Sequence, residues 1–135
     1  MKTELIFFDK FQNSIQGTQR GLIAFISLIV LDFIWFSLMK SKYYTTKKPI
    51  NIFSALLVYL ILCSALGVQL PKNYGEALVY SLLIGLVIYG VFNLTNYSIL
   101  NEWKLDIVIY DILWGMFNCA VAGSLIYLIY WNNKI

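Results

Sequence analysis

The sequence predicts an all-α integral membrane protein: an antiparallel bundle of four transmembrane helices with a short N-terminal interfacial helix. Three observations support this fold class. Of the 135 residues, 60% are hydrophobic and only 13% are charged, whereas soluble domains carry about 25% charged residues. The charges collect in short breaks between long apolar runs. Each run is long enough, at about 1.5 Å per helical residue, to cross roughly 30 Å of hydrocarbon.

The first twenty residues differ from the rest of the chain. Apolar residues recur there at helical spacing, with charged and polar residues between them: Leu5, Phe8, Phe11 and Ile15. This pattern is typical of an amphipathic helix that lies on a membrane surface, and a terminus without stable structure is an equally good interpretation. We therefore divide the chain into an amphipathic N-terminal segment, 1–20, and a four-helix transmembrane domain, 21–135.

Four apolar runs follow, at about 21–39, 50–70, 76–100 and 105–130. The breaks between them are short, so consecutive helices are expected to pack antiparallel. The break at 40–48 holds four lysines, which is typical of a topology signal or of contact with lipid headgroups. No stretch indicates recognition of nucleic acid. We expect a multi-pass protein of a cytoplasmic (inner) membrane, or of a viral or internal membrane.

Polar side chains inside these spans are costly and call for an explanation. When residues are counted from the ends of the spans, five polar side chains lie roughly 9–15 Å below the same membrane face. They come from four different helices: Asp32, Tyr59, Asn93, Asn96 and Asp111. Polar residues placed at random would scatter in depth. We therefore predict a polar layer inside the bundle, near one leaflet.

The spacing of these residues also predicts their direction. Tyr89, Asn93 and Asn96 are spaced i, i+4 and i+7, so they share a face of the third helix. Asp111 and Asn118 are seven residues apart and share a face of the fourth helix. Both faces are expected to point into the bundle.

We take Asp32 and Asp111 as candidate catalytic residues, acting as acid and base. Each is followed three residues later by a tryptophan. The candidate binding residues are Trp35, Tyr59, Tyr89, Asn93, Thr95, Asn96, Trp103, Trp114 and Asn118. A network that only ties helices together is the alternative. Polar bonds of this kind in membranes average about 0.6 kcal/mol, which is a weak reason to bury two aspartates.

Several of these residues form motifs. The segment 31–36, LDFIWF, resembles an LDxxWL motif, and 89–96, YGVFNLTN, resembles a YxxYDLTN signature. Leu100, Trp103 and the segment 111–115, DILWG, match the rest of a TNxxxLxxW … DxxWG pattern. Over about residues 22–130 the chain thus resembles a family of small, four-span predicted membrane proteins of unknown function. The resemblance implies a fold and a site but no reaction.

The chain departs from that family in two ways. The aspartate of the DLTN motif is Asn93 here, which removes one of three carboxyls, and the segment before the first span is longer than usual. If the family's activity uses that carboxyl, this member has lost or changed it.

Composition narrows the chemistry. The sequence contains no histidine, which excludes an imidazole base and metal or haem centres ligated by histidine. Two carboxylates without a further acid make a poor cage for a hard cation, so we expect no metal site. No cofactor-binding motif appears, and we expect no cofactor.

Three functions stay open. Binding or modification of a lipid or another small apolar molecule is preferred, with membrane lipids as partners, and the sequence does not settle whether the protein is an enzyme. A proton or cation pathway and a structural role in a membrane assembly are the alternatives. Gly115, Cys119 and Gly123 recur every four residues and let another helix approach closely. That helix belongs either to the same chain or to a homo-oligomer.

Overall fold

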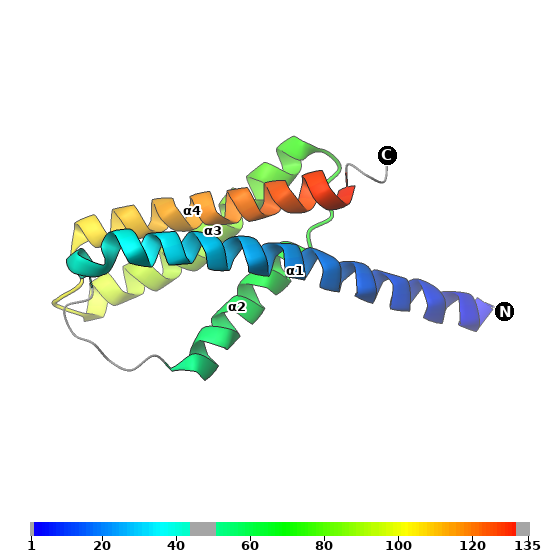
Figure 1. Cartoon of the computed structure of the whole chain (residues 1–135), viewed down its shortest axis with the longest axis horizontal. Helices are drawn as coiled ribbons and strands as arrows, with labels where there is room; N and C mark the ends of the chain where they lie inside the picture. The colour runs from blue at the N-terminus through cyan, green and yellow to red at the C-terminus, as the bar shows by residue number, and fades with distance from the viewer. Residues whose placement is uncertain (1, 44–50, 132–135) are drawn as a thin grey trace.

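The computed structural model describes residues 2–43 and 51–131, and these residues are organised as helices joined by short connections, without a strand. The helices are α1 (Lys2–Tyr43), α2 (Ile52–Gly67), α3 (Tyr74–Ile99), α4 (Leu105–Ile126) and the π-helical turn η1 (Tyr127–Trp131), which continues α4. In Figure 1, α4 runs beside α1 and beside α3, whereas α2 crosses α1 and diverges from the other helices.

Three segments of the described chain are long and apolar enough to cross a membrane: Ile15–Met39, Tyr74–Ile99 and Leu105–Trp131. Helix α2 is also apolar but has 16 residues, about 24 Å of helix, which is less than the roughly 30 Å of a hydrocarbon core. The all-helical, multi-pass character expected from the sequence is thus confirmed.

Helix α1 differs from the expected arrangement. It has 42 residues and continues through the boundary expected between residues 20 and 21, so no separate short N-terminal helix exists. Its first part extends beyond the other helices (Figure 1). The physical reason is that Gly17 and Gly21 weaken a helix by only about 1 kcal/mol each, and no proline lies before position 49 to interrupt it. The side chains of 1–12 lie outside the described residues, so the amphipathic pattern there stays a prediction.

Two asparagines set the starts of the middle helices. The Asn51 side chain accepts a hydrogen bond from Ser54 N at 3.1 Å, and the Asn73 side chain accepts one from Glu76 N at 2.9 Å. Glu76 Oε2 in turn accepts from Lys72 N at 2.9 Å. Side-chain caps of this kind satisfy backbone donors that a helix leaves unpaired at its first turn. Most of the basic break, residues 44–50, lies outside the described part of the chain.

Helices α3 and α4 pack closely because small residues line their contact. A Cβ atom added at Gly85 would lie 2.6 Å from Met116 Cα. Gly115 and Gly123 leave room for the side chains of Tyr89 and Ser81. The small residues of α4 therefore pack within the chain. Homo-oligomer formation stays a prediction.

The packing of α2 is uneven along its length. Its buried residues, Leu62, Leu66 and Gly67, all lie in its C-terminal half. The core that they join contains Leu28 of α1 and Ala122 of α4. The first seven residues of α2 leave apolar side chains such as Phe53 exposed. The first turns of α2 therefore diverge from the other helices (Figure 1).

Candidate functional site

A cavity of about 350 Å³ lies where the four helices face one another. Both predicted acids, Asp32 of α1 and Asp111 of α4, line it. The other lining residues are apolar or aromatic: Trp35, Phe36, Val58, Leu62, Ile88, Tyr89, Phe92 and Trp114. The structure thus brings the two carboxyl groups to one cavity, although they are 79 residues apart in the sequence.

The Asp32 carboxylate accepts hydrogen bonds from two other helices. Tyr59 Oη of α2 donates to Oδ2 at 2.7 Å, and Asn118 Nδ2 of α4 donates to Oδ1 at 2.8 Å. Asn118 is fully buried, so its amide is a fixed donor. Asp32 is thereby held by helices on both sides of α1, and the predicted contact among these spans is present.

The Asp111 carboxylate is held by α3. Asn93 Nδ2 donates to Asp111 Oδ2 at 2.6 Å and also to the backbone oxygen of Tyr89 at 2.9 Å. On its other side, Asn93 Oδ1 accepts from Trp103 Nε1 at 3.2 Å. Asn93 is 0% exposed. One buried amide therefore connects the α3–α4 turn to the carboxylate inside the bundle.

The hydrogen bonds that the described residues give to the two carboxylates all come from neutral side chains. A carboxylate has about four lone-pair sites, so one or two neutral donors leave some of its oxygen lone pairs able to accept further hydrogen bonds. No cationic side chain in the described part of the chain is paired with either carboxylate. A bound group that donates hydrogen bonds can therefore still be accepted at these oxygens.

Aromatic rings form the cavity wall next to the acids. The rings of Trp35 and Trp114 stack with centroids 4.9 Å apart and an interplanar angle of 19°. The two Asp-x-x-Trp segments thus meet through their tryptophans. Phe92 packs edge-on against Trp103 at 5.8 Å. Trp114 Nε1 is buried, and within the described part of the chain it has no hydrogen-bond partner.

Two predicted binding residues lie away from this cavity. Thr95 is exposed, and its backbone oxygen accepts from Ser98 Oγ. Asn96 is half-buried near the end of α3, and neither residue lines the cavity. At about 100° per residue, Thr95 points roughly opposite to Asn93. Asn96 lies four residues after Phe92, so it shares a face of α3 with the lining residues but is one turn further along the helix.

Several apolar lining residues were missed by sequence reasoning, which counted polar and large aromatic groups. Three of them carry a usable signal. Phe36 lies four residues after Asp32, Phe92 lies three residues after Tyr89, and Leu62 lies three residues after Tyr59. Each therefore shares a helix face with a residue already predicted. Val58 gives no such signal, because its place depends on how α2 crosses α1.

A model of the family described as "Predicted membrane protein (DUF2177)" matches residues 20–128. The match includes every motif residue on which the resemblance rests, and its bounds lie within two residues of those expected. No curated protein and no solved structure matches the chain.

Proposed function

The chain belongs to the DUF2177 family of predicted membrane proteins, which is uncharacterised, and we propose that it binds or modifies a lipid or another apolar molecule in the cavity of Asp32 and Asp111. The observation that carries the proposal is the composition of this cavity, with two carboxylates set in a wall of apolar and aromatic side chains. Ligand sites are mostly apolar, with a few polar groups that fix orientation.

The position of α2 supports entry from the lipid phase. Val58 and Leu62 of α2 line the cavity, whereas the preceding turns of this helix stand apart from the bundle (Figure 1). We propose that a molecule moving in the bilayer reaches the acids between α2 and its neighbours without crossing water. We also propose that α2 spans the membrane with the other three helices, and that the membrane is a cytoplasmic (inner) one or a viral or internal one.

The polar groups of the cavity define the chemistry of the ligand. Carboxylate oxygens accept hydrogen bonds, so the ligand would present a hydroxyl or amine to Asp32 and Asp111. The stacked rings of Trp35 and Trp114 offer an aromatic surface, which favours a cationic amine. Trp114 Nε1 would donate to an ester or ether oxygen of the same molecule. If the bound molecule is turned over, Asp32 and Asp111 are the acid and the base.

The test uses Asp32→Asn and Asp111→Asn in the full chain. Each protein is purified in a mild detergent, and the lipids and small molecules that copurify are identified by mass spectrometry. We expect the natural protein to enrich one class of amine- or hydroxyl-bearing molecule and each variant to lose about tenfold of this enrichment, since a hydrogen bond to a charged group contributes about 1.5–3 kcal/mol.

The matched control is Asp106→Asn, which removes an exposed acid from the first turn of the same helix as Asp111. This variant should retain the enrichment. The proposal is wrong if both cavity variants keep the profile of the natural protein. Comparing the lipids of whole cells that express each protein separates binding from modification, because only turnover changes the cellular amounts.

A proton or cation pathway is less well supported. Fully buried apolar residues, Leu28 and Ala122, lie one turn from Asp32 and Asn118 toward the opposite membrane face. Such a layer interrupts a polar path. A proton or sodium leak through liposomes that contain the protein would nevertheless favour the pathway, and a stoichiometric copurifying protein would favour a role in an assembly.

A further inference from the structure

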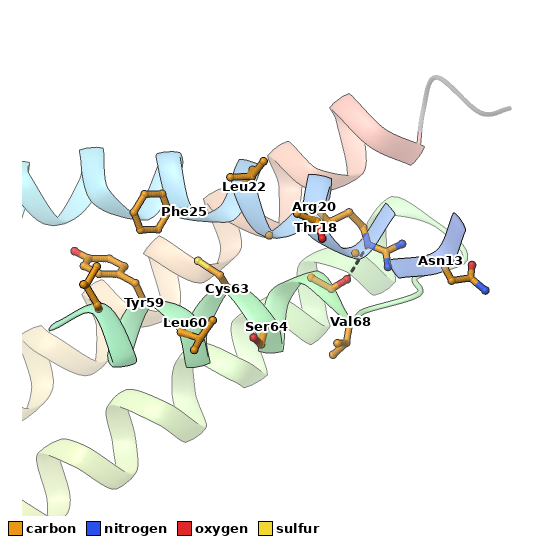
Figure 2. Close-up of a pocket in the computed structure, with 14 residues that line it drawn as sticks. Asn13, Thr18, Arg20, Leu22, Phe25, Tyr59, Leu60, Cys63, Ser64 and Val68 are labelled. Carbon is orange, nitrogen blue, oxygen red and sulfur yellow. Dashed lines mark hydrogen bonds between the residues drawn. The ribbon is translucent and has the colours of Figure 1, made fainter. Parts of the chain in front are cut away.

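A second concave region, the α1–α2 groove, has a volume of about 670 Å³. In Figure 2, Arg20 and Asn13 lie at one end of this groove, and Phe25 and Tyr59 lie at the other. Leu60 lies between the two ends. The Arg20 end is the end of the molecule at which α2 and η1 finish, opposite to the α3–α4 turn (Figure 1).

Arg20 is a buried cation at this end. It is 7% exposed, and its Nε donates to the backbone oxygen of Gly67 at 2.7 Å. Its guanidinium carbon lies 5.2 Å from the ring centroid of Tyr130 and 5.4 Å from that of Trp131. Helix α2 has no basic residue in its last turn, so Arg20 places a positive charge at the negative end of α2.

These contacts leave the charge of Arg20 without a described carboxylate. Among the described residues, its guanidinium contacts a backbone oxygen and two aromatic rings, and a guanidinium has five N–H donors. Its Nη2 lies 4.0 Å from the Cβ position of Gly17, a residue that lines the groove together with Asn13 and Thr18. A positive charge and polar side chains therefore meet at one end of the groove.

The remainder of the groove is apolar. It is lined by Leu22 and Phe25 of α1 and by Leu56 and Leu60 of α2. From Gly67 to Leu56 the helix covers eleven residues, about 17 Å, which is close to half of the roughly 30 Å hydrocarbon thickness. Tyr130 and Trp131 at the cationic end are typical of the membrane–water interface. The groove thus has the length of one leaflet, with its cation at headgroup depth.

We propose that the α1–α2 groove binds a phospholipid with an anionic headgroup, whose phosphate lies at Arg20 and whose acyl chain lies along α1 and α2 toward Tyr59. Charge complementarity selects this occupant, because a buried guanidinium suits phosphate geometry. The proposal does not depend on the function of the Asp32–Asp111 cavity.

The experiment uses the purified full chain, freed of bound lipid and placed in nanodiscs of phosphatidylcholine. Phosphatidylglycerol and phosphatidylcholine with identical acyl chains are then titrated, and bound lipids are counted by native mass spectrometry. Phosphatidylcholine has the same phosphate but would place its quaternary ammonium beside the Arg20 guanidinium, and like charges that meet cost free energy. We therefore expect phosphatidylglycerol to bind about tenfold more tightly, a difference of about 1.4 kcal/mol. Glycerol phosphate, which has the charge but no acyl chain, should not bind measurably. Equal binding of the two lipids, or binding of glycerol phosphate, would overturn the proposal.

Three variants identify the site. Arg20→Met should abolish the preference for phosphatidylglycerol. Leu60→Trp fills the groove but keeps Arg20 and its bond to Gly67, and it should weaken binding about tenfold even if Arg20→Met fails to fold. Lys72→Met removes an exposed cation just beyond α2 and should change nothing.

Unchanged binding in Leu60→Trp, or a loss in Lys72→Met as large as in Arg20→Met, would show that the lipid responds to general charge and not to the groove. Asp111→Asn should keep the preference. This result separates the groove from the proposed function of the cavity, because Asp111 is bonded to Asn93 of α3 and neither residue lines the groove.

Discussion

Asn93 joins three parts of the structure through one amide. Its nitrogen donates hydrogen bonds to Asp111 and to the Tyr89 backbone oxygen, and its oxygen accepts one from Trp103. The related family motif has an aspartate here, and an ionised aspartate donates no hydrogen bond. In this chain the Asn93 amide is a neutral hydrogen-bond donor to Asp111, so Asp111 is the single carboxylate at this end of the cavity.

Replacing Asn93 by leucine should destabilise the protein by about 1–3 kcal/mol. The change leaves the Asp111 carboxylate and the Trp103 N–H without their partner, and a buried polar group without a partner carries its full desolvation cost. Unfolding by sodium dodecyl sulfate in mixed micelles measures the difference. Thr95→Ala on the same helix is the control, because Thr95 is exposed. A loss below about 0.5 kcal/mol in Asn93→Leu would show that the network does not hold the bundle.

Helices α3 and α4 owe their close contact to glycine. At Gly85 an added Cβ would lie 2.6 Å from Met116 Cα and 2.7 Å from the Gly115 backbone oxygen. Backbone atoms cannot rotate away as a side chain can. Gly90, one and a half turns later on the same helix, has nothing within 4 Å of the added atom. The two glycines therefore differ in what they do, although both are buried in the same helix.

The pair Gly85→Ala and Gly90→Ala tests this contact. Gly85→Ala must move α3 away from α4 and should cost about 1–3 kcal/mol, the usual range for overpacking. Gly90→Ala should be neutral or stabilise the helix by up to about 1 kcal/mol, because alanine favours a helix over glycine. Thermal unfolding in detergent, monitored as the loss of monodisperse protein, ranks the stabilities of the two variants and the natural protein. Equal effects of the two changes would contradict the packing described.

Helices α1 and α2 approach each other closely at glycine residues. A Cβ added at Gly67 would lie 3.4 Å from Gly17 O and from Gly21 N, so α1 and α2 cross where both helices present glycine. The bond from Arg20 to Gly67 lies at the same place. From this crossing toward its N-terminus, α2 diverges from α1. The α1–α2 groove lies on one side of α2, and the Asp32–Asp111 cavity lies on the other.

The arrangement of the whole molecule predicts where each connection lies. The start of α2 and the α3–α4 turn lie at one end of the bundle, and the α2–α3 connection lies at the other (Figure 1). If α2 spans the membrane as proposed, cysteines introduced at Ile52 and Glu102 should react with an impermeant maleimide from the same side. A cysteine at Lys72 should react from the opposite side. All three residues are exposed.

The labelling is compared in intact and inverted vesicles, with Cys63 and Cys119 replaced by alanine so that only the introduced thiol reacts. Labelling of Ile52→Cys and Lys72→Cys from one side would show that α2 does not cross, and the lateral entry proposed for the ligand would then fail. The Glu102→Cys result is independent of α2, because α3 has the length to span.

The depth of the polar residues in the membrane can be predicted from their positions in the sequence. A helix rises by a constant amount per residue, and antiparallel spans share the same two membrane faces. Counting from each turn therefore predicted one level for Asp32, Tyr59, Asn93, Asn96 and Asp111, of which Asn96 lies outside the cavity. The structure joins Tyr59 to Asp32 and Asn93 to Asp111 by direct hydrogen bonds. Secondary structure and the level of the site are thus properties of local periodicity and hydropathy.

The direction of each side chain and the spaces between helices depend on contacts between residues distant in sequence. The turn of α3 against α4, set by Gly85, directs Asn93 inward and leaves Thr95 outside. The crossing at Gly67 opens the cavity and the groove, and buries Arg20. Periodicity states which residues share a face, but not which neighbour that face meets, because the rotation of a helix is decided by how closely its partner can approach.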